Sequence, residues 1–226
     1  MGTSRSYDDA CPIARALDVV GERWALLVIR ELLLGPQRFS DLRRALPGAS
    51  TNILTDRLRE LEKHGLVRQD RLPPPAASRV YELTERGNEL TPALEALGAW
   101  GAPIPAPDGR PGLSAVSMLL FLRGCLRTHP DPPTGVYCIQ LDERIWTILA
   151  GESGAAVEPG DSASPDATLR TDPWTLNTLI ADPTRLESAI ASPAAEAGGD
   201  VASLRRLLEA ASETGGGSTA LRYPRR

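Results

Sequence analysis

The segment from Ser50 to Gly65 carries apolar residues at helical spacing. Leu54, Leu58 and Leu61 stand at positions i, i+4 and i+7, which places them on one face of a helix. Ser50 is a residue type preferred at a helix N-cap, and Gly65 is typical of the position just after a helix end. The pattern therefore predicts a helix between these two residues, with one apolar and one polar face.

Helical periodicity also recurs elsewhere in the first half of the chain. It predicts helices over residues 12–20, 22–34, 39–46 and 85–100. Ser40 is expected to be the N-cap of the third of these, and Pro47-Gly48 supplies a tight turn into the helix that follows Ser50. Two short helices joined by such a turn are typical of a helix-turn-helix arrangement.

Two stretches of alternating character follow the Ser50 helix, at 66–72 and 79–84, and this alternation predicts two strands. A proline-rich tip, 73–77, separates them, with Arg71 and Arg79 at its flanks. Helix, hairpin and basic flanks together predict a winged helix that binds DNA.

The polar face of the Ser50 helix carries side chains that donate hydrogen bonds to phosphates or base edges. The whole chain has a net charge of −4, but residues 36–80 hold nine basic and five acidic residues. This local excess is also compatible with an ordinary solvated surface of mixed charge; the helix and hairpin favour a DNA-binding face. The candidate DNA-binding residues are Ser50, Thr51, Asn52, Thr55, Arg59, Lys63, Arg71 and Arg79.

A segment rich in proline and glycine, 102–112, predicts a semi-rigid linker between two domains. Beyond it, the pattern predicts helices over 113–127, 174–181, 185–191 and 202–211, and strands over 135–142, 144–151, 155–158 and 167–171. We therefore expect domains at 9–101 and 113–211, a disordered tail at 212–226, and an α+β fold class.

No constellation of residues predicts catalysis, a bound metal or a cofactor. The two histidines, His64 and His129, fall in different domains, and neither lies in a recognisable motif. Glycines 151 and 154 enclose Glu152-Ser153, a spacing one residue too short for a nucleophile elbow. We therefore do not expect the protein to be an enzyme.

The few cysteines, three in number, and the lack of a signal-peptide apolar region predict a cytoplasmic protein. The longest apolar runs, 24–34 and 115–122, are too short or too interrupted to cross a bilayer, so no membrane partner is expected.

A set of motifs within residues 10–101 resembles the HxlR-type family of bacterial winged-helix regulators. They are Cys-Pro, Gly-x-x-Trp, Phe-x-x-Leu, Leu-x-x-Leu-x-x-x-Gly-Leu and Leu-Thr-x-x-Gly, in this order. The resemblance implies a homodimer, formed by residues around 11–19 and 90–100, on double-stranded DNA with a palindromic operator. It also implies recognition by the Ser50 helix and by the arginines of the wing. The three prolines at 73–75 depart from the family because they stiffen the tip and remove hydrogen-bond donors.

Cys11 is the candidate reactive group, since it precedes a proline that opens a helix. The helix dipole and its free N–H groups favour a thiolate there. Some HxlR-type regulators use a matching cysteine to sense oxidants or electrophiles. The alternative is a cysteine that only packs at a subunit interface.

The order of elements after the linker, with the runs DATLRTDPWTLNTLIADP and GGDVASLRRLLEA, resembles the sterol-carrier-protein-type lipid-binding fold. This resemblance implies a five-stranded sheet packed with helices as a sandwich, holding an apolar ligand between the layers. The residues it implies for the ligand are Met118, Leu122, Tyr137, Ile139, Trp146, Ile148, Trp174 and Leu179. The same apolar periodicity is also compatible with a plain hydrophobic core.

These features together predict a bacterial transcriptional regulator, acting as a repressor, whose operator binding responds to a hydrophobic small molecule in the second domain. One alternative makes the chain a lipid carrier or scaffold that uses the winged helix for dimerisation. Another makes it a regulator that senses redox state through Cys11.

Overall fold

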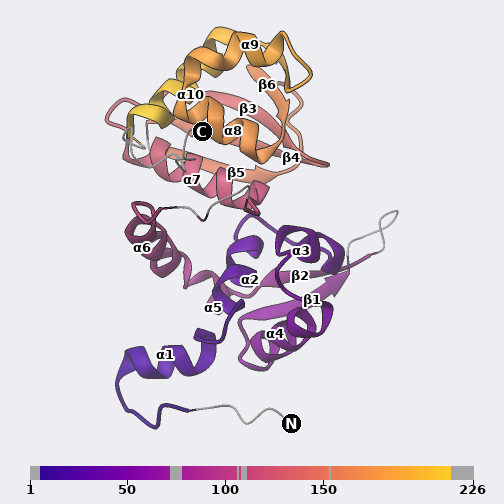
Figure 1. The fold of residues 1–226 in the computed structure, drawn as a ribbon, viewed down its shortest axis with the longest axis vertical. Coiled ribbons are helices and arrows are strands. Elements are labelled where there is room, and N and C mark those ends of the chain that lie inside the picture. Colours follow the sequence, from indigo (N-terminus) through magenta and orange to yellow (C-terminus); the bar gives the residue numbers. More distant parts are fainter. Residues whose placement is uncertain (1–5, 72–77, 106, 108–110, 153, 215–226) are drawn as a thin grey trace. The chain divides into compact units, whose positions relative to one another are not determined.

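The structure is a computed structural model of the 226-residue chain, and it describes residues 6–71, 78–105, 107, 111–152 and 154–214 (Figure 1). The chain divides into two compact units, residues 1–96 and 97–226. Helices and strands occur in both, so the expected α+β class is confirmed.

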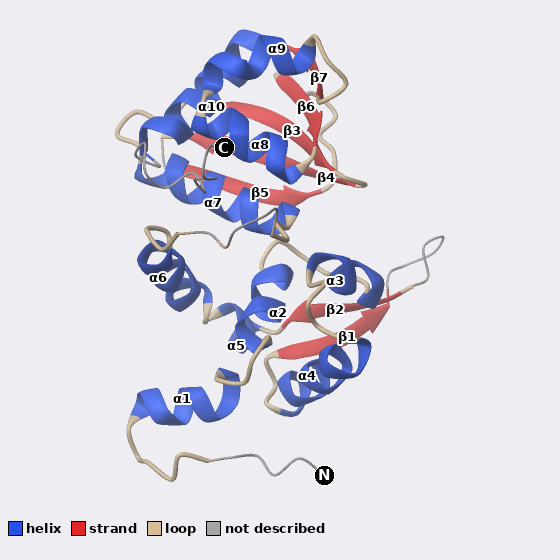
Figure 2. Cartoon of the chain, in the orientation of Figure 1, coloured by secondary structure: helices blue, strands red, loops and turns tan. Residues whose placement is uncertain are grey.

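The first unit is a winged helix-turn-helix, as predicted. Its elements are α1 (Pro12–Val20), α2 (Ala25–Leu32), α3 (Phe39–Ala45), α4 (Thr51–Lys63), β1 (Val67–Arg71), β2 (Arg79–Leu83), α5 (Glu85–Asn88) and the start of α6 (Thr91–Gly101). The hairpin of β1 and β2 is antiparallel, and it lies among α2, α3 and α4 (Figure 2).

The core of this unit depends on the apolar stripe of α4. Leu54, Leu58 and Leu61 are at most 1% exposed and join one cluster with residues of α2 such as Val28 and Ile29. Burying a leucine side chain contributes about 1.5–3 kcal/mol. The helix predicted from Ser50 to Gly65 is therefore confirmed, together with the face that it buries.

The start of α2 and the cap of α3 differ from the sequence prediction. Helix α2 begins at Ala25, because Trp24 adopts a left-handed backbone conformation with φ of 80° that no α-helix continues through. Its ring lies close to Gly48, where a Cβ would stand 2.7 Å from the ring. The N-cap of α3 is Arg38, so the prediction of Ser40 was wrong; Ser40 lies inside the helix.

The helix predicted over residues 85–100 is two helices, α5 and α6. Pro92 explains the break, because proline has no N–H to bond the Asn88 carbonyl and its ring clashes with that carbonyl in a continuous helix. In the structure the Thr91 hydroxyl donates to the Asn88 carbonyl instead, at 2.7 Å.

The second unit contains a five-stranded sheet covered on one face by helices (Figure 1). Its elements after α6 are α7 (Ala115–Thr128), β3 (Gly135–Leu141), β4 (Arg144–Gly151), β5 (Gly154–Pro159), β6 (Ala167–Thr171), α8 (Pro173–Ala181), a 3₁₀ turn (Pro183–Arg185), α9 (Leu186–Ile190), β7 (Ala195–Gly199) and α10 (Val201–Thr214). The strand order is β5-β4-β3-β6-β7, and only the β3–β6 pair is parallel among these neighbours.

Strand β3 shows why the sheet is one-sided. Tyr137, Ile139 and Leu141 are at most 1% exposed, whereas Gln140, on the other face, reaches solvent. Such alternation places every second side chain under the helices. Four strands and the helix order match the prediction, but α10 runs to Thr214, three residues into the segment expected to be disordered.

Gly87 provides a test of the packing in the first unit. A Cβ at this buried residue would stand 2.1 Å from the Leu66 carbonyl oxygen, which is backbone and cannot turn aside. We expect Gly87→Ala to destabilise the first unit by roughly 1–3 kcal/mol, as overpacking does. Denaturant unfolding followed by circular dichroism measures the change.

Gly124→Ala is the matched control, since a Cβ at Gly124 in α7 meets nothing within 4 Å. Alanine should stabilise that helix by about 0.5–1 kcal/mol. Equal stability of Gly87→Ala and the native protein would contradict the close contact.

Candidate nucleic-acid interface

The N-terminus of α4 is exposed and firmly capped. The Ser50 hydroxyl oxygen accepts a hydrogen bond from the Ile53 N–H at 3.3 Å, so Ser50 is the N-cap that the sequence predicted. Thr51 and Asn52 are exposed in the first turn of the helix. The turn after α3 leads directly into this end, which is the arrangement that presents a recognition helix to a major groove.

Two of the three cations of α4, Arg59 and Lys63, are exposed and are held by weak ion pairs. Arg59 lies 3.7 Å from Asp56, and Lys63 lies 3.9 Å from Glu60. The side chains of Arg59 and Lys63 are 73% and 68% exposed, and such surface pairs contribute at most about 1 kcal/mol. Both cations are therefore available to phosphates.

The hydroxyl groups on α4 are not equivalent. Thr55 donates its proton to the Thr51 carbonyl at 2.8 Å, so in this state it offers the α4 surface an acceptor and a methyl group. The Thr51 hydroxyl accepts from Nη1 of Arg43 at 3.2 Å and keeps its own proton for donation. Of the predicted residues on α4, Thr55 is thus the least suited to donate to DNA.

Arg43 is a residue of this surface that the sequence reasoning missed. It is exposed on α3, and its contact with Thr51 brings a guanidinium to the start of α4. The excess of basic residues between positions 36 and 80 was a signal for it, but helical periodicity assigned no role to its side chain.

The wing brings two predicted residues together. Arg71 and Arg79 are directly opposite each other in the β1–β2 register, and both are exposed. Like charges at opposite positions destabilise a hairpin, and a bound phosphate would relieve that repulsion. The proline-rich tip, 73–77, lies outside the described residues, so the expectation about it stays a prediction.

Gln37 ties the wing to the helical core, and the sequence reasoning missed this residue as well. Its N–H donates to the Tyr81 carbonyl at 2.9 Å, and its carbonyl accepts from the Tyr81 N–H at 2.8 Å. Its side-chain amide donates to the Glu31 carbonyl, and the residue is 3% exposed. Glutamine in a loop has no periodic signature, so sequence alone did not reveal this anchor.

Large apolar side chains are exposed on α1 and α6. They are Ile13 and Leu17 on α1, at 71% and 40%, and Leu97 and Trp100 on α6, at 49% and 72%. Leu90 and Leu94, by contrast, pack against the core of the first unit. The exposed residues fall in the two segments for which the family resemblance implies a dimer interface.

Cys11 is exposed at the N-cap of α1. The backbone N–H groups of Ala14 and Ile13 lower the pKa of its thiol by hydrogen bonding to the sulfur. Burial raises the pKa of the Cys125 thiol to about 11, and burial followed by the neighbouring Asp161 raises the pKa of Cys138. Among the three cysteines, Cys11 is the one set up to form a thiolate.

The described part of the chain contains no cluster of three histidine, cysteine or acidic residues arranged to hold a metal ion. None of its helices is long and apolar enough to cross a membrane.

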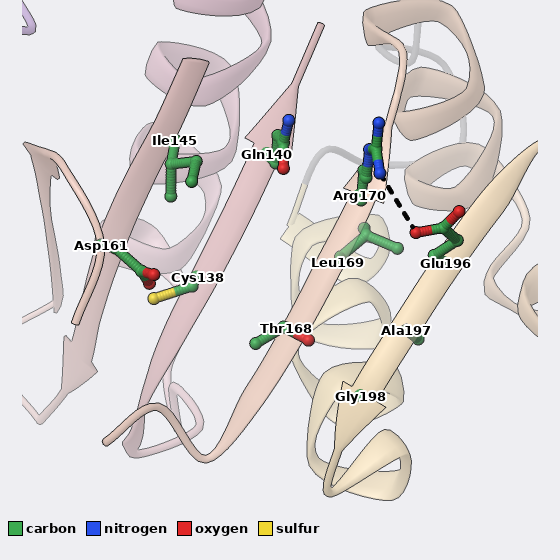
Figure 3. A pocket seen from close by; sticks show the side chains of 10 residues that line it. All are labelled: Cys138, Gln140, Ile145, Asp161, Thr168, Leu169, Arg170, Glu196, Ala197 and Gly198. Carbon is green, nitrogen blue, oxygen red and sulfur yellow. Dashed lines mark hydrogen bonds and ion pairs between the residues drawn. The ribbon is translucent and has the colours of Figure 1, made fainter. Parts of the chain in front are cut away.

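Most of the eight residues proposed to line an apolar cavity lie in the second unit's interior. Seven are at most 2% exposed: Met118, Leu122, Tyr137, Ile139, Trp146, Ile148 and Leu179. Trp174 is half-buried, and its indole N–H donates to the Pro111 carbonyl at 3.2 Å. The hollow drawn in Figure 3 is lined by other residues, so a role for these eight in ligand binding stays a prediction.

Comparisons with known proteins match the N-terminal part of the chain. The model of the HxlR-like helix-turn-helix family matches residues 19–107. An uncharacterised HTH-type transcriptional regulator of Synechocystis, sll1512, is 44% identical over 92 residues, which are 41% of this chain and 68% of that protein. YvaP and YodB of Bacillus subtilis, also HTH-type transcriptional regulators, are 39% and 35% identical, over 42% and 40% of this chain and 89% and 81% of their own lengths.

Solved structures give matches of the same extent. The redox regulator HypR in its oxidised form is 32% identical over 43% of this chain and 100% of its own, with a TM-score of 0.40. The quinone-bound YodB from Bacillus subtilis is 33% identical over 40% of this chain and 97% of its own, with a TM-score of 0.35.

The thiol chemistry of Cys11 leads to a prediction. Because alkylation requires a thiolate, we expect iodoacetamide at neutral pH to modify Cys11 well before Cys125 or Cys138. Because the pKa of the Cys11 thiol is lowered, Cys11 should still react at pH values too low for an ordinary thiol. Peptide mass spectrometry over time measures the order of modification.

Cys11→Ser should remove the fast phase and leave the slow ones unchanged. Equal rates at all three cysteines would show that the helix N-terminus does not activate Cys11.

Proposed function

This chain belongs to the HxlR-like helix-turn-helix family, and we propose that it is a transcriptional regulator that binds a palindromic operator as a homodimer. The observation that carries the proposal is the exposed polar face of α4, whose N-terminus is capped by Ser50 and whose exposed cations, Arg59 and Lys63, are held by weak surface pairs. Its relatives are HTH-type transcriptional regulators.

Recognition divides between base contacts and phosphate contacts. Side chains at the N-terminal end of a recognition helix reach base edges, whereas backbone contacts fix its register on the duplex. In our proposal Asn52 and Arg59 contact bases in the major groove. Thr51, Lys63 and the wing pair Arg71 and Arg79 then hold the phosphates on either side.

The homodimer is supported by the exposed apolar side chains of α1 and α6. Trp100, at 72% exposure, and Ile13, at 71%, would be costly to leave in water in an isolated subunit. A dimer buries such residues and places two copies of α4 on two half-sites.

Arg59→Ala tests base recognition. If Arg59 contacts a base, we expect binding to weaken by about 1–3 kcal/mol on the preferred duplex and far less on a scrambled one. Fluorescence anisotropy with a duplex that the protein selects from a random pool measures both affinities.

Arg206→Ala is the matched control, because Arg206 is an exposed arginine of α10 that pairs with Asp200 in the second unit. If Arg59→Ala binds both duplexes as tightly as the native protein does, Arg59 is not part of the DNA interface. An equal loss on both duplexes would make Arg59 a phosphate contact.

We also propose that a hydrophobic small molecule bound in the second unit alters operator binding. Support comes from the apolar layer between sheet and helices, and from Trp146, whose indole N–H is buried without a hydrogen-bond partner among the described residues. An effector with a hydrogen-bond acceptor would satisfy that donor. It must bind the DNA-competent and DNA-incompetent states with different affinities.

Trp146→Phe and Trp174→Phe test this effector site. With a hydrophobic extract of the source cells, we expect the native protein to change its affinity for DNA and the variants to keep DNA affinity but lose the response. Arg206→Ala is the control, since the Arg206 side chain is exposed on α10 and pairs with Asp200. If the extract changes the DNA affinity of the native protein and of both variants equally, the effector does not bind at this site.

A carrier or scaffold in which the winged helix only dimerises is the first alternative. Phosphate contacts make the logarithm of affinity fall linearly with the logarithm of salt concentration. If the protein has no affinity for DNA that falls with salt in this way, the carrier or scaffold function is favoured.

Redox control through Cys11 is the second alternative, supported by the exposed thiol and its lowered pKa. HypR is named a redox regulator, and YodB has been solved with a bound quinone. Loss of DNA binding on treatment with an oxidant, absent in Cys11→Ser, would favour this mode of control.

A further inference from the structure

Asp56 is the one acidic residue between Ser50 and Arg59, in the half of α4 that a recognition helix presents to DNA. It follows the buried Leu54 by two residues, which is a rotation of roughly 200° about the helix axis. Its side chain therefore points away from the core, and it is 69% exposed. Asp56 thus lies near the middle of the face that carries the candidate DNA-binding residues.

The two residues that we propose to contact bases stand on either side of Asp56. Asn52 precedes it by four residues and Arg59 follows it by three, and residues at these separations are neighbours on a helix surface. A helix that brings both Asn52 and Arg59 to base edges therefore also brings Asp56 into the major groove. In this respect the inference rests on the proposed function.

The Asp56 carboxylate keeps its capacity to accept hydrogen bonds. One of its oxygens lies 3.7 Å from Nη1 of Arg59, which is longer than a hydrogen bond, and both side chains are exposed. An ionised carboxylate only accepts hydrogen bonds, and among the phosphates of DNA its charge is repelled. A hydrogen-bond donor on a base is needed to offset that repulsion.

Only two bases present such a donor in the major groove. They are cytosine, with its N4 amino group, and adenine, with its N6 amino group. Adenine also presents N7, an acceptor whose lone pair repels a carboxylate, whereas cytosine has no acceptor on this edge. Guanine and thymine present acceptors there. Cytosine is therefore the base that fits a carboxylate.

We propose that Asp56 recognises a cytosine in each half-site by accepting a hydrogen bond from its N4 amino group. Arg59, beside it, remains able to donate to guanine. The role of Asp56 is specificity, because its charge weakens binding to every sequence that places an acceptor at this position.

Selection of duplexes from a random library by the full-length protein tests the proposal. The native protein should enrich cytosine at one position of each half-site. Asp56→Ala should lose the preference at that position and keep the others. Asp56→Asn should move the preference towards adenine, because an amide both donates to N7 and accepts from N6 of that base.

Fluorescence anisotropy then compares the selected duplex with one in which thymine replaces that cytosine. We expect the native protein to bind the thymine duplex about tenfold more weakly and Asp56→Ala to bind the two duplexes alike. Glu60→Gln is the matched control, because it removes the same charge from the same helix. Glu60 is 47% exposed and pairs with Lys63, and its variant should keep the preference for cytosine.

Three results would contradict this account. If Asp56→Ala selects the same sequences as the native protein and binds all of them more tightly, Asp56 is only a repelling surface charge. If the position at which Asp56→Ala loses its preference holds another base in the native selection, the assignment to cytosine is wrong. If the native protein enriches no sequence, the proposed function itself fails, and the inference fails with it. Circular dichroism confirms the fold of each variant.

Discussion

The burial of Leu54, Leu58 and Leu61 is the interaction on which the proposed DNA surface depends. It fixes the rotation of α4 about its axis, and residues such as Thr51, Asn52 and Arg59 then face solvent. The Ser50 cap fixes where the helix starts, so Thr51 and Asn52 stand at its open end. Core packing and the recognition surface are therefore two consequences of one pattern.

The sequence predicted α4, both wing strands and the four strands β3 to β6, because each depends on local periodicity and local caps. It placed the start of α2 and the cap of α3 wrongly, since the left-handed Trp24 and the Arg38 cap are not encoded in periodicity. The same limit hid Gln37 and Arg43, whose roles come from partners distant in the sequence, Tyr81 and Thr51. Trp24, Gln37 and Arg43 each contact a residue that is distant in the sequence: Gly48, Tyr81 and Thr51.

The sheet of the second unit separates two chemistries. Toward the helices it presents closely packed apolar side chains such as Tyr137 and Ile139. Away from them it presents a hollow that is lined by both apolar and polar residues, among them Ile145, Gly198 and Arg170. The hollow follows from the register of β6 and β7, which a resemblance in element order does not reveal.

Selection of duplexes from a random DNA library by the full-length protein tests the central claim most directly, because the protein itself then chooses the operator sequence. A dimer that presents two copies of α4 should enrich an inverted repeat whose half-sites lie about one helical turn, roughly 10–10.5 base pairs, apart or a multiple of that. Enrichment of one unrepeated site would contradict the symmetric dimer. No enrichment over the starting library would contradict sequence-specific DNA binding itself.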